Sequence, residues 1–94
     1  GRAPGEVAGV LMSDRLDRMR ANPRADWRMA DVEAVCREHG ALVDPPRGGG
    51  SHFKVHAPGM RDYLTVPSRR PIKPVYIKQL VHFLDELRRR NAQP

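Results

Sequence analysis

Hydrophobic residues recur with a helical period in three stretches of the chain. In the clearest, residues 74–90, six apolar side chains fall within about 120° of a helical wheel, and Pro74 suits the first turn. Residues 31–39 form a shorter amphipathic stretch and precede Gly40, the residue type favoured just after a helix. Residues 13–20 place apolar side chains on one side, with Ser13 as the expected N-cap and Asp14 in the first turn. The pattern therefore predicts three helices.

A period of two occurs in the middle of the chain. Residues 51–57 alternate strictly, which places Phe53 and Val55 on a buried face. Residues 61–66 alternate again with Leu64 and Val66 inward, and the Pro-Gly pair at 58–59 predicts a turn that joins the two strands as a hairpin. Residues 41–43 predict a short additional strand, closed by the Asp-Pro-Pro sequence that follows. The outward face of the strand at 51–57 carries His52, Lys54 and His56.

The order of these elements predicts an α+β fold. After the N-terminal helix the chain runs α-β-β-β-α, which gives one three-stranded antiparallel sheet with two helices on one face. A length of 94 residues allows one domain with a modest core. The longest apolar run, residues 7–12, is far shorter than the about 20 residues that span a bilayer, so we expect no membrane association and a cytoplasmic location.

All of the excess positive charge of the chain belongs to its second half. Residues 1–46 carry seven Arg against eight acidic residues, a net charge of −1, whereas residues 47–94 carry ten Lys and Arg against three acidic residues, a net charge of +7. We therefore expect a surface that binds a polyanion such as RNA in the second half. The residues expected to contact it are Arg47, Gly50, Ser51, Lys54, His56, Arg69, Arg70 and Lys73.

The outward face of the strand at 51–57 is the candidate functional surface. A solvated polar face is the usual interpretation of such a strand. This one is rich in imidazole, however, and it follows Arg47 and three glycines that allow backbone N–H groups to approach a ligand. Along a strand His52 and Lys54 lie about 6.6 Å apart, close enough to contact one phosphodiester, whereas His52 and His56 lie about 13 Å apart. We therefore expect one catalytic histidine with cationic and backbone helpers, and His56 as a substrate contact.

The other histidines and the single cysteine are interpreted as structural. His39 lies near the end of an apolar helical stripe, which favours a core or capping role, and His82 lies on the polar side of the last helix. Cys36 lies on a buried stripe, and a single cysteine excludes an internal disulfide and a cysteine-based zinc cage. No two histidines are four residues apart on a predicted helix, so we expect no metal site.

Four local motifs occur in a fixed order between Val32 and about Leu84. They are an amphipathic helix ending in His39-Gly40, a Gly50-Ser51-His52 opening to an alternating strand, a Leu64-Thr65-Val66-Pro67 close to the hairpin, and a Lys73-Pro74 entry to the last helix. In these motifs the chain resembles the HicA-family toxins, small messenger-RNA endonucleases of bacterial toxin–antitoxin pairs. It departs from that family in about 25 additional N-terminal residues and in a longer last helix.

The resemblance implies a double-stranded-RNA-binding-domain-like fold for residues 26–94. Residues 1–25 would then form an N-terminal extension, partly disordered and with a short helix. The resemblance also implies that His52, the histidine of the Gly-Ser-His motif, is catalytic. It further implies that cleavage of single-stranded messenger RNA needs no metal or other cofactor, and that a cognate HicB-like antitoxin covers the site.

The chemistry expected of such a site is that of an endoribonuclease. The neutral imidazole of His52 removes the proton of a ribose 2′-hydroxyl, whose oxygen then attacks the adjacent phosphorus. Lys54, Arg47 and the loop amides would stabilise the charge on the phosphoryl oxygens. Water, Lys54 and the imidazolium of His52 are three candidates for the acid that protonates the leaving 5′-oxygen. Two alternative functions are a non-catalytic RNA- or DNA-binding module and a basic domain that binds an acidic protein.

Overall fold

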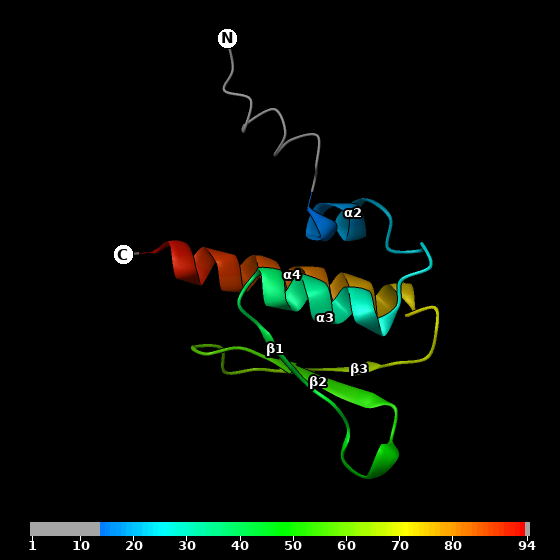
Figure 1. Cartoon of the computed structure of the whole chain (residues 1–94). Coiled ribbons are helices and arrows are strands. Elements are labelled where there is room, and N and C mark those ends of the chain that lie inside the picture. Colours follow the sequence, from blue (N-terminus) through cyan, green and yellow to red (C-terminus); the bar gives the residue numbers. More distant parts are fainter. Residues whose placement is uncertain (1–13, 94) are drawn as a thin grey trace.

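A computed structural model describes residues 14–93 as a three-stranded sheet with helices on one side of it (Figure 1). The strands are antiparallel and lie in the order β1-β2-β3. The predicted α+β fold, with its single antiparallel sheet between helical segments, is confirmed. Within the described residues no helix is long and apolar enough to cross a membrane. The elements are α2 (Arg15–Ala21), α3 (Met29–Glu38), β1 (Leu42–Asp44), β2 (His52–His56), β3 (Leu64–Pro67) and α4 (Pro74–Ala92).

The register of the sheet determines which side chains share its outward face. Lys54 on the central strand β2 pairs with Asp44 of β1 and with Thr65 of β3, and His52 pairs with Pro67. Because side chains alternate along a strand, these residues all face away from the helices. The opposite face belongs to the core, where Val55 is fully buried, as predicted, whereas Phe53 near the beginning of β2 is only partly buried.

The third strand begins later than the alternation predicted. It starts at Leu64, not at residue 61, because the Pro58-Gly59 turn is followed by a longer connection. The Met60 N–H donates to the Ala57 carbonyl at 3.1 Å, and Gly59 has a φ of +81°, which glycine adopts without strain. Tyr63 therefore lies outside the strand ladder, next to its start.

Helix α3 begins two residues before its predicted start and ends as predicted. The Arg28 backbone N–H donates to the Asp31 carboxylate at 3.0 Å, which caps the beginning. At the other end His39 is the C-cap, and Gly40 follows with a φ of +83°. The Ala41 N–H then donates to the Cys36 carbonyl at 2.8 Å, so the chain turns directly into β1.

Helix α2 is capped by Asp14, which was expected in the first turn. Its carboxylate accepts the Asp17 backbone N–H at 2.9 Å, so the cap lies one residue later than expected. The expected cap Ser13, and the disorder expected in the first residues, lie outside the described residues. Leu16 and Met19 of α2 are fully buried in the same core as α3, α4 and the sheet. The core thus extends across the predicted boundary between residues 25 and 26.

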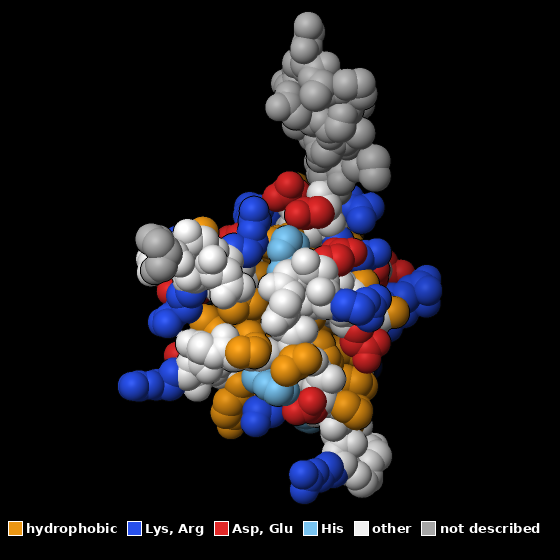
Figure 2. Space-filling view, turned by 60° about the vertical axis from the view of Figure 1, so that its left-hand side comes forward, with side chains coloured by type: hydrophobic (Ala, Val, Ile, Leu, Met, Phe, Trp, Pro, Cys, Tyr) orange, Lys and Arg blue, Asp and Glu red, His pale blue; other side chains and the backbone are white. Residues whose placement is uncertain are grey.

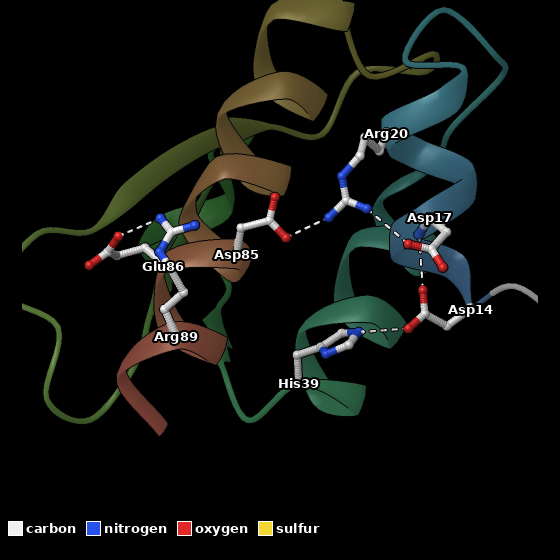
Figure 3. Close-up of polar contacts among 7 residues, drawn as sticks. All are labelled: Asp14, Asp17, Arg20, His39, Asp85, Glu86 and Arg89. Carbon is white, nitrogen blue, oxygen red and sulfur yellow. Dashed lines mark hydrogen bonds and ion pairs between the residues drawn. The ribbon is translucent and has the colours of Figure 1, made fainter. Parts of the chain in front are cut away.

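Helix α4 supplies the largest part of the core, and Pro74 occupies its first turn as predicted. Val81 is also buried, although it lies off the predicted apolar stripe, on a helix against which α2 packs. Arg20 of α2 forms an ion pair with Asp85 of α4 at the edge of this contact (Figure 3). The buried residues of α4 are Ile77, Leu80, Val81, Phe83, Leu84 and Leu87.

The burial of α2 makes a prediction about stability. Leu16→Ala removes a fully buried side chain, so we expect a loss of about 2–5 kcal/mol in the free energy of unfolding, measured by chemical denaturation. Arg18→Ala on the exposed side of the same helix is the control and should change stability by no more than about 0.5 kcal/mol. If the two variants are equally stable, α2 is not part of the cooperative core.

Candidate functional site

The candidate site lies on the outward face of the sheet, where β2 presents three polar side chains. His52 and Lys54 are exposed, and His56 is about one-third exposed. Large apolar side chains are exposed near the His56 end of the sheet, with Leu42 of β1 at 51% and Tyr63, just before β3, at 58%. The space-filling view shows hydrophobic side chains gathered on one part of the molecule with Lys and Arg at its margins (Figure 2). The face is therefore mixed, with cations beside apolar surface.

His56 is held by a neighbouring carboxylate. Its Nε2 lies 2.9 Å from an oxygen of Asp44, which sits diagonally across the ladder on β1. A carboxylate only accepts hydrogen bonds, so a neutral imidazole donates here from Nε2 and keeps Nδ1 as an acceptor. The sequence reasoning did not include Asp44, because it assigned that residue to a turn; the pairing of β1 with β2 is the signal that would have found it.

Lys54 is positioned by an aromatic ring. Its Nζ lies 4.4 Å from the centroid of the Tyr63 ring, a distance at which a cation and a π-face attract each other. Tyr63 was not predicted as a site residue. Tyr63 lies two residues before Thr65, the ladder partner of Lys54, and it adds an exposed aromatic surface to the site.

The glycine-rich segment before β2 is a defined turn. Arg47–Gly49 form one turn of 3₁₀ helix, in which Gly48 and Gly49 have φ values of +70° and +83°. These two positions favour glycine for conformational reasons. Gly50 is different, because its backbone is extended and an added Cβ would make only ordinary contact with Pro46 at 3.6 Å.

Four of the predicted binding residues line one hollow of about 620 Å³ beside the beginning of β2: Ser51, Arg69, Arg70 and Lys73. The ladder brings them together, since the Ser68 N–H donates to the Ser51 carbonyl at 2.8 Å and so places the start of the connector, residues 68–73, beside Ser51. Helix α4 begins at the same place with no acidic residue in its first turn. Arg47, Gly50, Lys54 and His56 do not line this hollow.

Arg70 differs from the other two cations because an acidic side chain holds it. Its Nε lies 3.1 Å from both carboxylate oxygens of Asp26, and its Nη2 donates to one of them. The hydrogen bond from Arg70 holds the pKa of Asp26 below its ordinary value, so the pair is charged at neutral pH. Arg69 and Lys73 are exposed and make no ion pair with another described residue.

The single cysteine and the other two histidines lie away from this face. Cys36 is fully buried, and desolvation raises its pKa to about 12, so the thiol stays uncharged at neutral pH. His39 is the C-cap of α3, and its Nε2 lies 3.5 Å from the Asp14 carboxylate at the start of α2 (Figure 3). His82 is exposed on α4. In residues 14–93 no three His, Cys, Asp or Glu side chains are grouped to hold a metal ion.

Comparison with known proteins found no relative of the chain. No family model, no curated protein and no solved structure matches the chain. The chemistry of the site is therefore argued from its own side chains.

The pairing of Arg70 predicts that one substitution strengthens anion binding. Asp26→Asn removes the carboxylate that balances Arg70, so this guanidinium becomes available to a phosphate. We expect tighter binding of a 2′-O-methyl oligoribonucleotide, and a salt dependence steeper by up to about 0.7 logarithmic units, the value for one phosphate on a single strand. Fluorescence anisotropy over a series of salt concentrations measures both.

Asp17→Asn is the matched control for this experiment. It makes the same change in net charge by removing a carboxylate that pairs with Arg20 on α2, away from the hollow, and Arg20 keeps its second partner Asp85. Equal effects of the two substitutions would mean that net charge, and not Arg70, determines the gain.

Proposed function

We propose that the protein is a metal-independent endoribonuclease that cleaves single-stranded messenger RNA, acting as a toxin of the HicA kind. The observation that carries the proposal is the position of His52. Its imidazole is exposed on the open face of the sheet, directly after Ser51 of the cationic hollow and two residues before Lys54. An imidazole, which can accept or donate a proton, is thereby placed between cations, where a phosphodiester would bind.

His52 acts as the general base in the proposed reaction. Its neutral imidazole takes the proton from a ribose 2′-hydroxyl, and the 2′-oxygen attacks the adjacent phosphorus. The bond from phosphorus to the 5′-oxygen breaks, which leaves a 2′,3′-cyclic phosphate on one product and a 5′-hydroxyl on the other. Water, Lys54 and the His52 imidazolium remain the candidates for the acid that protonates this oxygen.

Lys54 and the hollow cations stabilise the charge that develops during attack. Two residues along a strand span about 6.6 Å, so the Lys54 ammonium and the His52 imidazole can contact the same phosphate. The nearby Tyr63 ring limits the positions that the Lys54 side chain samples, because the ammonium rests over its face. The Lys54 side chain therefore loses less conformational entropy when the substrate binds.

His56 contacts a different part of the RNA in this proposal. About 13 Å separates it from His52 along the strand, which is too far for both histidines to act on one phosphate. Its Nε2 is engaged by Asp44, so Nδ1 is the ring nitrogen that meets the substrate. This arrangement lets an RNA strand extend along β2 from the hollow toward His56.

A non-catalytic RNA-binding module is the second candidate function. The exposed Tyr63 ring beside Lys54 favours it, because bases stack on aromatic side chains while cations bind the backbone. A cleavage assay separates the two functions. A defined RNA is incubated with the protein in EDTA, and the ends of the products are mapped; cyclic phosphate ends support the endoribonuclease, and intact RNA supports the binding module.

His52→Ala tests the catalytic assignment. The side chain is exposed and buries no core surface, so we expect an unchanged melting temperature and a loss of at least about 100-fold in RNA cleavage. Binding of a 2′-O-methyl RNA should change little. His82→Ala, which removes an exposed histidine from α4, should cleave normally; cleavage by His52→Ala at the wild-type rate would refute the assignment.

A second prediction concerns the restraint of this activity, with a HicB-like antitoxin as the proposed partner in the cytoplasm. The open face carries exposed cations, so an acidic protein that covers His52 and Lys54 would compete with RNA for the same groups. The central strand β2 is hydrogen-bonded on both sides, and its amides exchange slowly even without a partner. Chemical labelling of the side chains is therefore the better measurement.

In a complex purified from the native host, we expect strong protection of the His52 imidazole against diethylpyrocarbonate and of Lys54 against acetylation. His82 on α4 should be labelled as in the free protein. RNA cleavage that persists in the saturated complex would contradict occlusion of the site.

A further inference from the structure

The hollow beside Ser51 differs in charge from four other hollows on the described part of the chain. Of the five described, each of the other four is lined by at least one Asp or Glu side chain, which offsets its basic residues. The hollow beside Ser51 is lined by Arg69, Arg70 and Lys73 and by no carboxylate. Asp26 binds Arg70 from outside the lining, which leaves Arg69 and Lys73 to attract an anion.

The rest of the lining is made of rings. Pro67, Pro71 and Pro74 contribute pyrrolidine rings, and Tyr76 contributes a half-buried aromatic ring. The volume of about 620 Å³ lies within the range of about 300–1,000 Å³ that is typical of small-molecule sites. A bare phosphate would leave these apolar rings uncovered. A planar base covers them and carries its phosphate toward the cations, so a nucleotide fits both parts of the lining.

The hollow also adjoins the proposed catalytic residue. Ser51 directly precedes His52 in the chain, and Pro67 lies opposite His52 in the ladder between β2 and β3. His52 faces away from the helices, whereas Pro74 and Tyr76 of α4 line the hollow, so an RNA strand that passes around the beginning of β2 can occupy the hollow and bind at His52 together. In an RNA strand that occupant is the nucleotide flanking the scissile bond.

We propose that this hollow is a nucleotide-binding subsite, which takes the base and phosphate of the RNA residue beside the scissile phosphate. The base stacks against Tyr76 and the proline rings, and the phosphate pairs with Arg69 and Lys73. The position next to the scissile bond rests on the proposed function, whereas binding of a nucleotide does not require cleavage. A ring-lined hollow of fixed shape discriminates among bases, so the subsite sets a sequence preference at one position.

The test is a titration of the full chain, labelled with ¹⁵N and followed by amide chemical shifts. The probes are the four nucleoside 3′-monophosphates, the matching nucleosides and inorganic phosphate, each added separately. We expect saturable shifts at Ser51 and in residues 69–76 with at least one nucleotide. Its affinity should exceed that of phosphate and of its own nucleoside at least fivefold, because the subsite uses both moieties.

Three variants locate the binding. Lys73→Gln should weaken nucleotide binding at least fivefold by removing a phosphate contact. Tyr76→Leu keeps an apolar side chain but removes the aromatic face, and it should weaken nucleotide binding more than phosphate binding. Lys78→Gln, an exposed cation on α4 that lines a different hollow, is the matched control and should bind as the wild type does. Melting temperatures establish that each variant is folded.

Several results would overturn the subsite. Phosphate that binds as tightly as every nucleotide would indicate an anion site only, and shifts confined to β2 would place the nucleotide elsewhere. Tighter binding of an oligoglutamate peptide at residues 69–76 would assign the hollow to a protein partner. Failure of the RNA cleavage assay with intact nucleotide binding would refute the proposed function and leave the subsite standing.

Discussion

One backbone hydrogen bond determines where the cationic connector lies. The Ile72 N–H donates to the Trp27 carbonyl at 2.8 Å, which joins the connector before α4 to the segment before α3. Ile72 is itself almost fully buried, so the bond is reinforced by packing. Residues 69–71 and 73 therefore lie on a connector whose path is fixed. The charges of Arg69, Arg70 and Lys73 gather beside the beginning of β2, although none of these residues belongs to a helix or strand.

The segment that contains α2 and Trp27 stabilises the position of the connector. The Trp27 indole N–H donates to the Asn22 carbonyl at 2.8 Å, which closes the loop between α2 and α3. Leu16 and Met19 then anchor α2 in the core against α4. A loop held at both ends loses little further conformational freedom when a ligand binds. The part of the chain that looked like an addition to a smaller domain is thus a structural support for the basic side of the site.

The sequence was sufficient to predict the elements because its periodicities are strong. Six apolar positions on α4 and strict alternation on β2 fix both the type of element and the face that is buried. It was also sufficient to place His52 and Lys54 outward, because alternation depends only on neighbours in the chain. Boundaries were less accurate where a turn decided them, as at the start of β3.

Contacts between distant residues could not be predicted in the same way. The partners Asp44 for His56, Tyr63 for Lys54 and Asp26 for Arg70 depend on register and on the path of two connectors. Hydrophobic periodicity carries no information about the register of the sheet or the path of the connectors. The hollow was also missed, since three prolines and a tyrosine in separate places carry no signal until the fold brings them together.

The proline that ends β3 has a consequence for the free edge of the sheet. The Ser68 N–H points to Ser51 on β2, so by alternation the preceding residue directs its nitrogen to the opposite, unpaired side. That residue is Pro67, which has no N–H to offer. A strand from another molecule would find no donor at this end of the edge, and edge-to-edge aggregation is disfavoured there. The end of the sheet that carries His52 is thus kept accessible at high protein concentration without a loop to shield it.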